Sequence, residues 1–260
     1  MTTKNIKVIS YNVNGIRSAM NKGLVEWLTI ENPDVICFQE IKALKENVDC
    51  APFEALGYET FWYPAQKKGY SGVAIFSKIK PDAVHYGTGS EQSDFEGRVI
   101  RLDFGKMSVI SAYFPSGTTG EERQGYKYTW LEEFFGHIDE LIKEQRSLIV
   151  CGDYNICHKP IDIHNPVSNK NSSGFLPEER AWMDKWFANK LIDTFRISQP
   201  NLEGQFTWWS YRANARANNK GWRIDYISVT EDLKEKVISA AILPEAKHSD
   251  HCPVSVVLEH

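Results

Sequence analysis

The sequence predicts an α/β fold in the form of a layered sandwich. Three observations favour it: short runs rich in Val, Ile and Tyr recur along the chain, helical patterns lie between them, and no Pro/Gly/Ser-rich linker separates them. Helices set among many strands favour this arrangement over an all-β barrel. We therefore expect a single domain over residues 1–260.

Apolar runs bounded by turn residues are the predicted strands, because β-branched and aromatic residues favour extended backbone. In chain order they cover residues 6–11, 35–38, 72–77, 99–104, 107–114, 148–151, 224–229, 237–243 and 254–258. Two of them, in the segments VISYNVNG and LIVCGDYN, run into a Tyr-Asn pair. That likeness hints at two related halves packed together.

Three amphipathic patterns predict helices between these runs. Over residues 126–143 the apolar side chains recur at steps of three and four, which gives one buried helix face. A second helix covers Leu24 to Leu28 and ends before Pro33, which cannot continue it. A third begins at Pro177, a residue suited to a first helical turn, and has acidic residues where the helix dipole favours them.

The composition, with 42% hydrophobic and 25% charged residues, is that of a globular protein and excludes a disordered chain. No stretch approaches the roughly 20 apolar residues that span a bilayer, and the start lacks a signal-peptide core. The five cysteines are an odd number without a C-x-x-C pair, which argues against a disulfide framework or a structural zinc site. We expect a cytoplasmic protein that makes no membrane contact.

The net charge of −4 argues against a protein that coats nucleic acid by bulk charge, but it allows a local basic face. Residues 208–223, WWSYRANARANNKGWR, are such a segment, with four cations, no acidic residue and interleaved aromatic rings. Cations that neutralise phosphates and rings that stack on sugar or base are what a nucleic-acid groove requires. Arg212 and Arg216 are therefore predicted DNA contacts; the alternative is a solvated basic loop beside core tryptophans.

Polar side chains follow several predicted strands where chemistry in layered α/β folds usually lies. They are Asn12, Asn14, Glu40, Asp153, Asn155, Asp225, Asp250 and His251. Any one could simply form a turn, but their recurrence favours one oxygen-rich pocket with a single imidazole. Such ligands suit Mg²⁺ or Mn²⁺ better than Zn²⁺ and predict metal-assisted phosphoryl chemistry.

These residues lie in six blocks, SYNVNGIR, FQEIK, AYFPSG, GDYNICH, WRIDY and SDHCPV. Their order resembles that of the endonuclease/exonuclease/phosphatase superfamily, and more narrowly of the exonuclease III type of abasic-site DNA endonuclease, from about Lys7 to Leu258. The resemblance implies a four-layered α/β sandwich, with two mixed β-sheets packed face to face and helices outside. Because the first strand begins near residue 6, we expect no redox-linked arm of the kind that some relatives carry.

The resemblance also implies a role for each matching residue. Glu40 would be the principal metal ligand, and the other residues at the metal would be Asn12, Asp153, Asn155, Asp250 and His251. The catalytic residues would be Tyr113 on the phosphate, Asp153 to activate water, Asn155 to orient it, and the pair Asp225–His251 at the scissile phosphate. The DNA contacts would include Lys42 and an apolar slot for a flipped-out abasic sugar, formed by Trp208, Trp222 and Ile224.

The function implied is a Mg²⁺-dependent DNA repair nuclease, with Mn²⁺ as a substitute, that hydrolyses the phosphodiester 5′ to an abasic site. It would also have 3′-to-5′ exonuclease and 3′-end-trimming activity on double-stranded DNA with abasic or 3′-blocked ends, and act as a monomer. One alternative is a phosphatase or phosphodiesterase for small or lipid phosphates, against which residues 208–223 argue. The other is a non-catalytic DNA-binding module, against which the complete set of polar strand ends argues.

Overall fold

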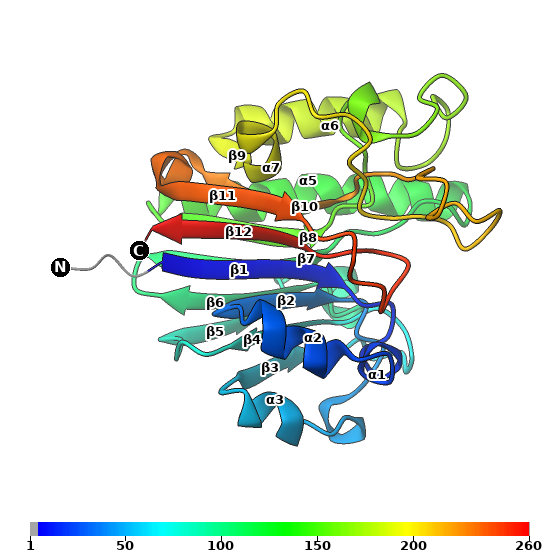
Figure 1. Cartoon of the computed structure of the whole chain (residues 1–260). Coiled ribbons are helices and arrows are strands. Elements are labelled where there is room, and N and C mark those ends of the chain that lie inside the picture. Colours follow the sequence, from blue (N-terminus) through cyan, green and yellow to red (C-terminus); the bar gives the residue numbers. More distant parts are fainter. Residues whose placement is uncertain (1–4, 260) are drawn as a thin grey trace.

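In the computed structural model, which describes residues 5–259, two six-stranded sheets pack face to face (Figure 1). The first sheet has the order β11 (Val237–Ile242), β12 (Val254–Glu259), β1 (Asn5–Asn12), β2 (Val35–Gln39), β4 (Val73–Ser77), β3 (Glu59–Tyr63). The second has the order β5 (Ala83–Tyr86), β6 (Val99–Phe104), β7 (Met107–Tyr113), β8 (Ser147–Asp153), β10 (Asp225–Thr230), β9 (Leu191–Asp193). Residues 1–4 and 260 of the predicted domain lie outside the described residues.

Both sheets are mixed, as predicted. β1 pairs with β2 in parallel and β7 pairs with β8 in parallel, whereas the remaining neighbours are antiparallel. Every predicted apolar run overlaps one of these strands. The strands that the sequence pattern missed are β3, β5 and β9, and each lies at the edge of its sheet. An edge strand has one hydrogen-bonded neighbour and a more exposed face, so its sequence lacks a continuous apolar run.

The two sheets have the same strand order, so the hint of two related halves is right at the level of topology. The order β11-β12-β1-β2-β4-β3 in one sheet matches β5-β6-β7-β8-β10-β9 in the other. That match makes β1 the counterpart of β7 and β2 the counterpart of β8. The likeness between VISYNVNG on β1 and LIVCGDYN on β8 therefore joins strands that are not equivalent in the two sheets.

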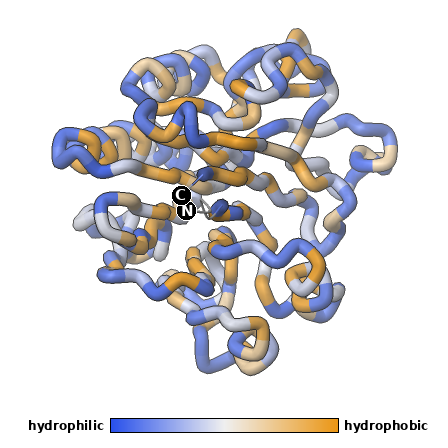
Figure 2. Tube along the Cα trace, turned by 60° about the vertical axis from the view of Figure 1, so that its left-hand side comes forward, coloured by the Kyte–Doolittle hydropathy of each residue, from blue (hydrophilic) through white to orange (hydrophobic). Residues whose placement is uncertain are grey.

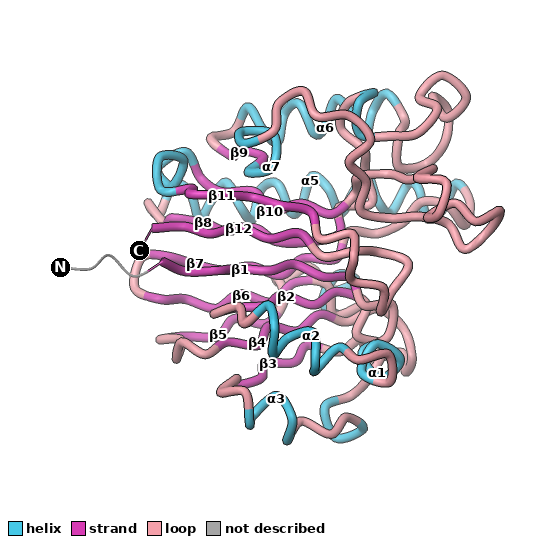
Figure 3. The backbone as a smooth tube through the Cα atoms, in the orientation of Figure 1, coloured by secondary structure: helices cyan, strands magenta, loops and turns pink. Residues whose placement is uncertain are grey.

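Helices cover the outer faces of both sheets (Figure 1, Figure 3). They are α1 (Ile16–Met20), α2 (Leu24–Glu31), α3 (Ala51–Ala55), α4 (Glu91–Phe95), α5 (Glu121–Lys143), α6 (Pro177–Ala188) and α7 (Thr194–Ser198), with short 3₁₀ turns at Lys45–Asn47, Pro160–Asp162 and Glu231–Lys236. α5 starts at Glu121, before the predicted residue 126. Its first turn is polar, so the pattern of apolar residues in the sequence did not extend to it. Within residues 5–259, every helix is too short or too polar to cross a lipid bilayer.

The main core lies between the two sheets, where apolar side chains from strands of both, such as Val8 and Ile149, form one buried cluster. A second cluster joins β7 and β8 to α5 and α6, and a third joins β1 and β2 to α1 and α2. The hydrophobic segments accordingly run through the interior, and the hydrophilic ones lie on the outer loops (Figure 2). This gives the four layers predicted.

The long loops gather at the end of the sandwich opposite the chain termini (Figure 1, Figure 3). The parallel strands β1, β2, β7 and β8 all point their carboxyl ends there. Side chains that follow these strands can therefore meet across the two sheets, and Asn12 of β1 does contact Asp153 of β8.

Candidate active site

A cavity of about 710 Å³ opens at this end of the sandwich. It is lined by most of the predicted site residues, namely Glu40, Tyr113, Asp153, Asn155, Trp208, Trp222, Ile224, Asp250 and His251. They come from the ends of β2, β7 and β8, the start of β10, and the loops before β10 and β12. Residues that are as much as 211 positions apart (Glu40 and His251) thus share one pocket.

Asp153 is a buried carboxylate whose two oxygens are both held by amides. Its Oδ2 accepts from Asn12 Nδ2 at 2.9 Å and from Asn155 Nδ2 at 3.3 Å, and its Oδ1 accepts from the Asn155 N–H at 2.9 Å. Burial raises the pKa of Asp153, and the neighbouring Asp225 raises it further, while His251 opposes both. The carboxylate is therefore oriented and made more basic than an exposed aspartate.

Asn12 departs from its predicted place at the metal. It is fully buried and does not line the cavity, and its Oδ1 already accepts the Asn14 N–H at 2.9 Å. Because its amide nitrogen donates to Asp153, Asn12 acts by orienting that carboxylate. The pattern of polar strand ends could not separate a side chain that enters the cavity from one that lies just beneath it.

His251 and Asp225 form the predicted carboxylate–imidazole pair. The distance between His251 Nδ1 and Asp225 Oδ2 is 2.9 Å, and His251 Nε2 lies 3.9 Å from Asp153 Oδ2. Burial alone lowers the pKa of His251, but the carboxylates of Asp225 and Asp153 outweigh it and raise the pKa to about 10. The imidazole is therefore a cation at neutral pH in this arrangement.

Glu40 sits directly after β2 in the left-handed region of backbone space, with φ of 50°. Its carbonyl accepts the Gly15 N–H at 2.7 Å, which helps to hold this sparsely populated conformation, and such strain is typical of functional sites. Its carboxylate accepts from the hydroxyl of Tyr113 and pairs with Lys42 Nζ at 2.8 Å. Lys42 also donates to Asn14 Oδ1 at 2.5 Å, so its ammonium is directed at the rim of the cavity.

The donor set fits a divalent cation. Asp153, Asp225 and, when its imidazole is neutral, His251 can each offer a ligand atom, with all three atoms within 4.8 Å of one another. Asp225 Oδ1 is buried and has no hydrogen-bond partner, which is costly for a carboxylate unless a cation or water satisfies it. The carboxylates of Glu40 and Asp250 line the same cavity. Carboxylate and amide oxygens favour hard cations such as Mg²⁺ and Mn²⁺.

Trp208, Trp222 and Ile224 lie together on one side of the cavity, as the slot hypothesis requires. The two indole rings meet edge to face, with centroids 6.1 Å apart, and Ile224 packs beneath them. Backbone hydrogen bonds of 2.9 Å in both directions tie Trp208 to Trp222. Trp208 Nε1 also donates to Asp250 Oδ2 at 3.0 Å, which joins the slot to the acidic side of the cavity.

The basic segment 208–223 is not uniformly free to meet DNA. Arg212 is exposed, as expected. Arg216 instead stacks on Trp209 and donates to the carbonyls of Ser249 and Ala246, at 2.9 and 2.6 Å, so its guanidinium holds the loop before β12. Arg223 is only 1% exposed and pairs with aspartates in the interior. Of the two predicted contacts, Arg212 is therefore exposed and Arg216 is engaged with the backbone, a difference that spacing along the chain does not reveal.

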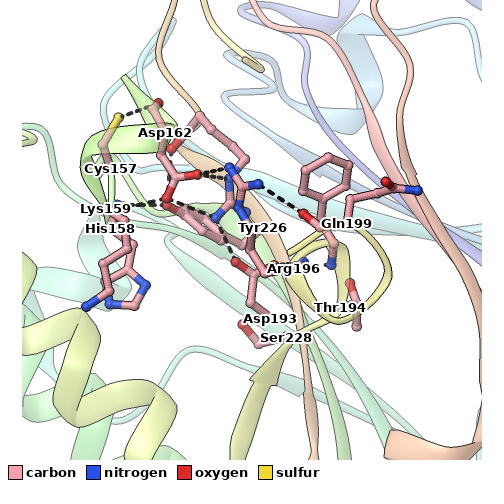
Figure 4. A network of polar contacts seen from close by, with 12 residues as sticks. Cys157, His158, Lys159, Asp162, Asp193, Thr194, Arg196, Gln199, Tyr226 and Ser228 are labelled. Carbon is pink, nitrogen blue, oxygen red and sulfur yellow. Dashed lines mark hydrogen bonds and ion pairs between the residues drawn. The ribbon is translucent and has the colours of Figure 1, made fainter. Parts of the chain in front are cut away.

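Arg223 belongs to a buried ion-pair network whose other members, Asp162, Asp193 and Arg196, are labelled in Figure 4. It donates from Nε to Asp162 Oδ1 at 2.8 Å and from Nη2 to Asp193 Oδ2 at 2.7 Å. Asp162 also accepts from Arg196 Nη2 at 2.5 Å. Because Arg223 lies between Trp222 and Ile224 in the chain, the network fixes the segment that carries the slot.

We expect Asp162→Asn to lower the free energy of unfolding by about 3 kcal/mol at pH 7, since it leaves Arg196 and Arg223 short of a counter-charge. Burial raises the pKa of Asp162, but Arg223 and Arg196 outweigh it and hold that pKa below the ordinary value. The stabilisation from this carboxylate is therefore present above its unfolded pKa of about 3.9 and is lost as the pH falls through the lowered folded value.

Urea unfolding at pH 7 and at about pH 3 would check this, because the difference between the two proteins should shrink at the lower pH. Asp184→Asn, at an exposed carboxylate on α6, is the matched control and should cost less than about 1 kcal/mol. An equal difference between Asp162→Asn and the parent at both pH values would contradict the role of the ionised carboxylate.

One wall of the cavity lies outside the predicted catalytic, metal and DNA-binding residues. Two segments form it: residues 116–124, which lead into α5, and residues 171–176, which lead into α6. Gln124 joins them, because its Oε1 accepts from Ser173 Oγ at 2.7 Å. Most of the lining residues in these segments are small and neutral, Glu121 being acidic and Leu176 apolar, and residues 171–176 follow no apolar strand. The pattern of polar strand ends therefore carries no signal for them.

A layered α/β sandwich with this oxygen-rich cavity at one end defines a metal-dependent hydrolase of phosphate esters. The chain matches the Endonuclease/Exonuclease/phosphatase family over residues 9–251. It belongs to that family, whose members depend on a metal, and its buried Asp153–Asp225–His251 cluster agrees with this.

Named relatives are similar along nearly the whole chain. An exodeoxyribonuclease of Bacillus subtilis is 44% identical over 97% of this chain and 99% of its own length. A DNA-(apurinic or apyrimidinic site) endonuclease of Dictyostelium discoideum is 38% identical over 98% of this chain and 71% of its own. The structure of an AP endonuclease from Archaeoglobus fulgidus superposes with a TM-score of 0.90 at 31% identity, covering 98% of this chain and 100% of that one.

Proposed function

We propose that this protein is a DNA repair nuclease that hydrolyses the phosphodiester 5′ to an abasic site and trims 3′ ends of double-stranded DNA. The observation that carries the proposal is one cavity in which an oriented carboxylate, Asp153, lies beside an aromatic slot formed by Trp208 and Trp222. Relatives named as an exodeoxyribonuclease and an apurinic-site endonuclease support both activities.

The buried carboxylate of Asp153 takes the proton of the attacking water, and Asn155, which shares hydrogen bonds with it, orients that water. His251, backed by Asp225, presents a positive charge to the phosphate as negative charge develops there. Tyr113, the last residue of β7, contacts a phosphate oxygen. The bond between phosphorus and the 3′-oxygen of the preceding nucleotide breaks, that oxygen takes a proton from water to become the 3′-hydroxyl, and the 5′-deoxyribose phosphate stays with the abasic residue.

We propose Mg²⁺ as the cation, held by oxygen atoms of Glu40, Asp153, Asn155 and Asp250, with Mn²⁺ as a substitute. When bound, the ion neutralises charge on the phosphate as a Lewis acid. His251 lines the same cavity, but its pairing with Asp225 favours the charge role over that of a ligand. Chelation with EDTA should abolish incision, and added Mg²⁺ should restore it.

A duplex with one tetrahydrofuran abasic analogue tests the proposal directly. Incubation with Mg²⁺ should produce a single incision 5′ to the lesion, and an undamaged duplex of the same sequence should show only digestion from its 3′ ends. Turnover of inositol phosphates or sphingomyelin with no incision of the lesion duplex would instead favour a small-phosphate hydrolase. Binding of the lesion duplex without any cleavage would favour a non-catalytic module.

Trp222→Ala is expected to lower the preference for an abasic site over intact nucleotides by about 10-fold. The indole closes the slot, and without it an intact nucleotide has room to enter. The measurement is the ratio of the incision rate at the lesion to the 3′-digestion rate of undamaged duplex. Trp27→Ala on α2, a half-buried tryptophan that does not line the cavity, is the matched control. Equal ratios in both variants would show that the slot does not determine the preference for an abasic site.

We further propose that residues 1–260 act as one domain and as a monomer, in the cytoplasm. The core shared by strands of both sheets supports a single domain, and the cysteine pattern supports a reducing compartment. Lys42 and Arg212, at the rim of the cavity and on an exposed loop, are proposed contacts to the DNA backbone. Sedimentation of the protein alone and with lesion duplex would measure its oligomeric state.

A further inference from the structure

A second pair of charges lies in the interior behind the cavity wall. Lys127 of α5 and Glu179 of α6 are both fully buried, and Lys127 Nζ lies 2.5 Å from Glu179 Oε1. Neither residue lines the cavity. The free-energy cost of moving two charges out of water cancels most of the free energy gained from their attraction. A contribution to folding stability therefore does not by itself explain why this ion pair is buried.

Lys127 reaches the residue that is proposed to orient the attacking water. Its Nζ donates to the backbone carbonyl of Asn155 at 2.9 Å. Asn155 has φ of 52°, a left-handed conformation that needs support from its surroundings. The Asn155 side chain is fixed from the other direction, because its Nδ2 donates to the carbonyl of Phe114 at 3.0 Å.

Glu179 holds the wall of the cavity. Its Oε2 accepts from the N–H groups of Gly174 and Leu176 at 2.6 and 2.9 Å. Its Oε1 accepts from Gln124 Nε2 at 3.1 Å, and Gln124 in turn binds Ser173. Four lining residues therefore depend on one carboxylate.

Gly174 brings the two halves of this arrangement together. A Cβ at this position would lie 3.0 Å from Cζ3 of Trp222 and 3.1 Å from the Asn155 carbonyl oxygen, and its φ is +93°. The Gly174 carbonyl also accepts the Cys157 N–H at 2.7 Å. Residue 174 of the cavity wall thus packs directly against both the Asn155 backbone and the ring of Trp222.

We infer that Lys127 and Glu179 are positioning residues that fix Asn155 and residues 173–176 relative to each other. The pair sets the direction of the Asn155 amide toward Asp153 and the width of the slot at Trp222. This inference rests on the proposed function, since it concerns the residue assigned to water orientation. It predicts an effect on the chemical step that loss of folding stability does not produce.

The test compares Lys127→Met with the double variant Lys127→Met/Glu179→Gln, which removes both charges and leaves no unpaired carboxylate in the interior. For both, kcat for incision of the lesion duplex, taken as the maximal rate divided by the concentration of active sites from DNA-binding titration, should fall about 10- to 100-fold with KM nearly unchanged. Arg146→Met is the matched control. It breaks an ion pair to the buried Asp103, 3.0 Å away, near the opposite end of β7 from Tyr113.

Hydrogen exchange of residues 154–158 and 172–176, measured on the same samples, gives a readout independent of activity. We expect faster exchange there in both variants and unchanged exchange there in Arg146→Met. If kcat per active site and this exchange both stay at the parent values, the inference is overturned and the pair is merely structural. If the parent cleaves no lesion duplex but the exchange still rises in both variants, the proposed function fails while the positioning of Asn155 stands.

Discussion

Asp153→Asn is expected to lower the rate of incision at an abasic site by about 10²- to 10⁴-fold. An amide cannot take the proton of the attacking water, and it also loses the charge that a metal ion requires. Because the side chain is nearly isosteric and its one amide oxygen can still accept from Asn12 or from the Asn155 N–H, the cavity should keep most of its shape. Affinity for the lesion duplex should therefore stay within a few-fold of the parent or rise, since a negative charge near the DNA phosphates is removed.

Single-turnover incision of the lesion duplex and fluorescence anisotropy of the same DNA would measure the two effects separately. Asp184→Asn, on the outer surface of α6, is the matched change of a carboxylate outside the cavity and should retain the parent rate. Equal rates for Asp153→Asn and the parent would remove the water-activating role.

His251→Gln should lower kcat/KM for incision by about 10²- to 10³-fold, because it deletes the positive charge beside the scissile phosphate. Glutamine can still donate a hydrogen bond, so the remaining activity measures the uncharged contact. The partner Asp225 would then be buried without a counter-charge, and the melting temperature should also fall.

His158→Gln supplies the control, because His158 also forms a histidine–aspartate pair, with Asp184 at 2.7 Å, but lies outside the cavity. It should leave kcat/KM at the parent value. A loss of the same size in both variants would mean that the effect comes from the fold rather than from charge at the phosphate.

The sequence predicted the layers of the fold and the strands of its interior because a strand buried on both faces has a continuous apolar run. β7 and β8, with five or more consecutive buried residues, are of this kind. It missed the edge strands β3, β5 and β9, where burial alternates or is partial. The equivalence of β1 with β7 was also out of reach, since it lies in the order of hydrogen-bonded neighbours.

For the site, the polar residues after apolar strands were the right set to gather, because parallel strands bring their carboxyl ends together. The pattern could not decide whether a side chain reaches the cavity or is buried in the protein interior. Asn12 lies beneath the cavity floor, Arg223 is in the interior, and Arg216 binds the backbone, although each has the residue type of a functional contact. Depth depends on packing between α5, α6 and the loops, which no local pattern encodes.

The position of the cavity, lined by residues of both sheets, has a thermodynamic consequence. Asp153 belongs to one sheet and Glu40 follows a strand of the other, so a substrate in the cavity contacts residues of both. If the two sheets separate, the substrate loses its contacts with one of them and dissociates. Bound DNA therefore stabilises the association of the two sheets. By linkage, DNA at 100 times its dissociation constant adds about 2.7 kcal/mol to the free energy of separating them. The free energy of separating the two sheets is thus higher for the DNA-bound protein than for the free protein.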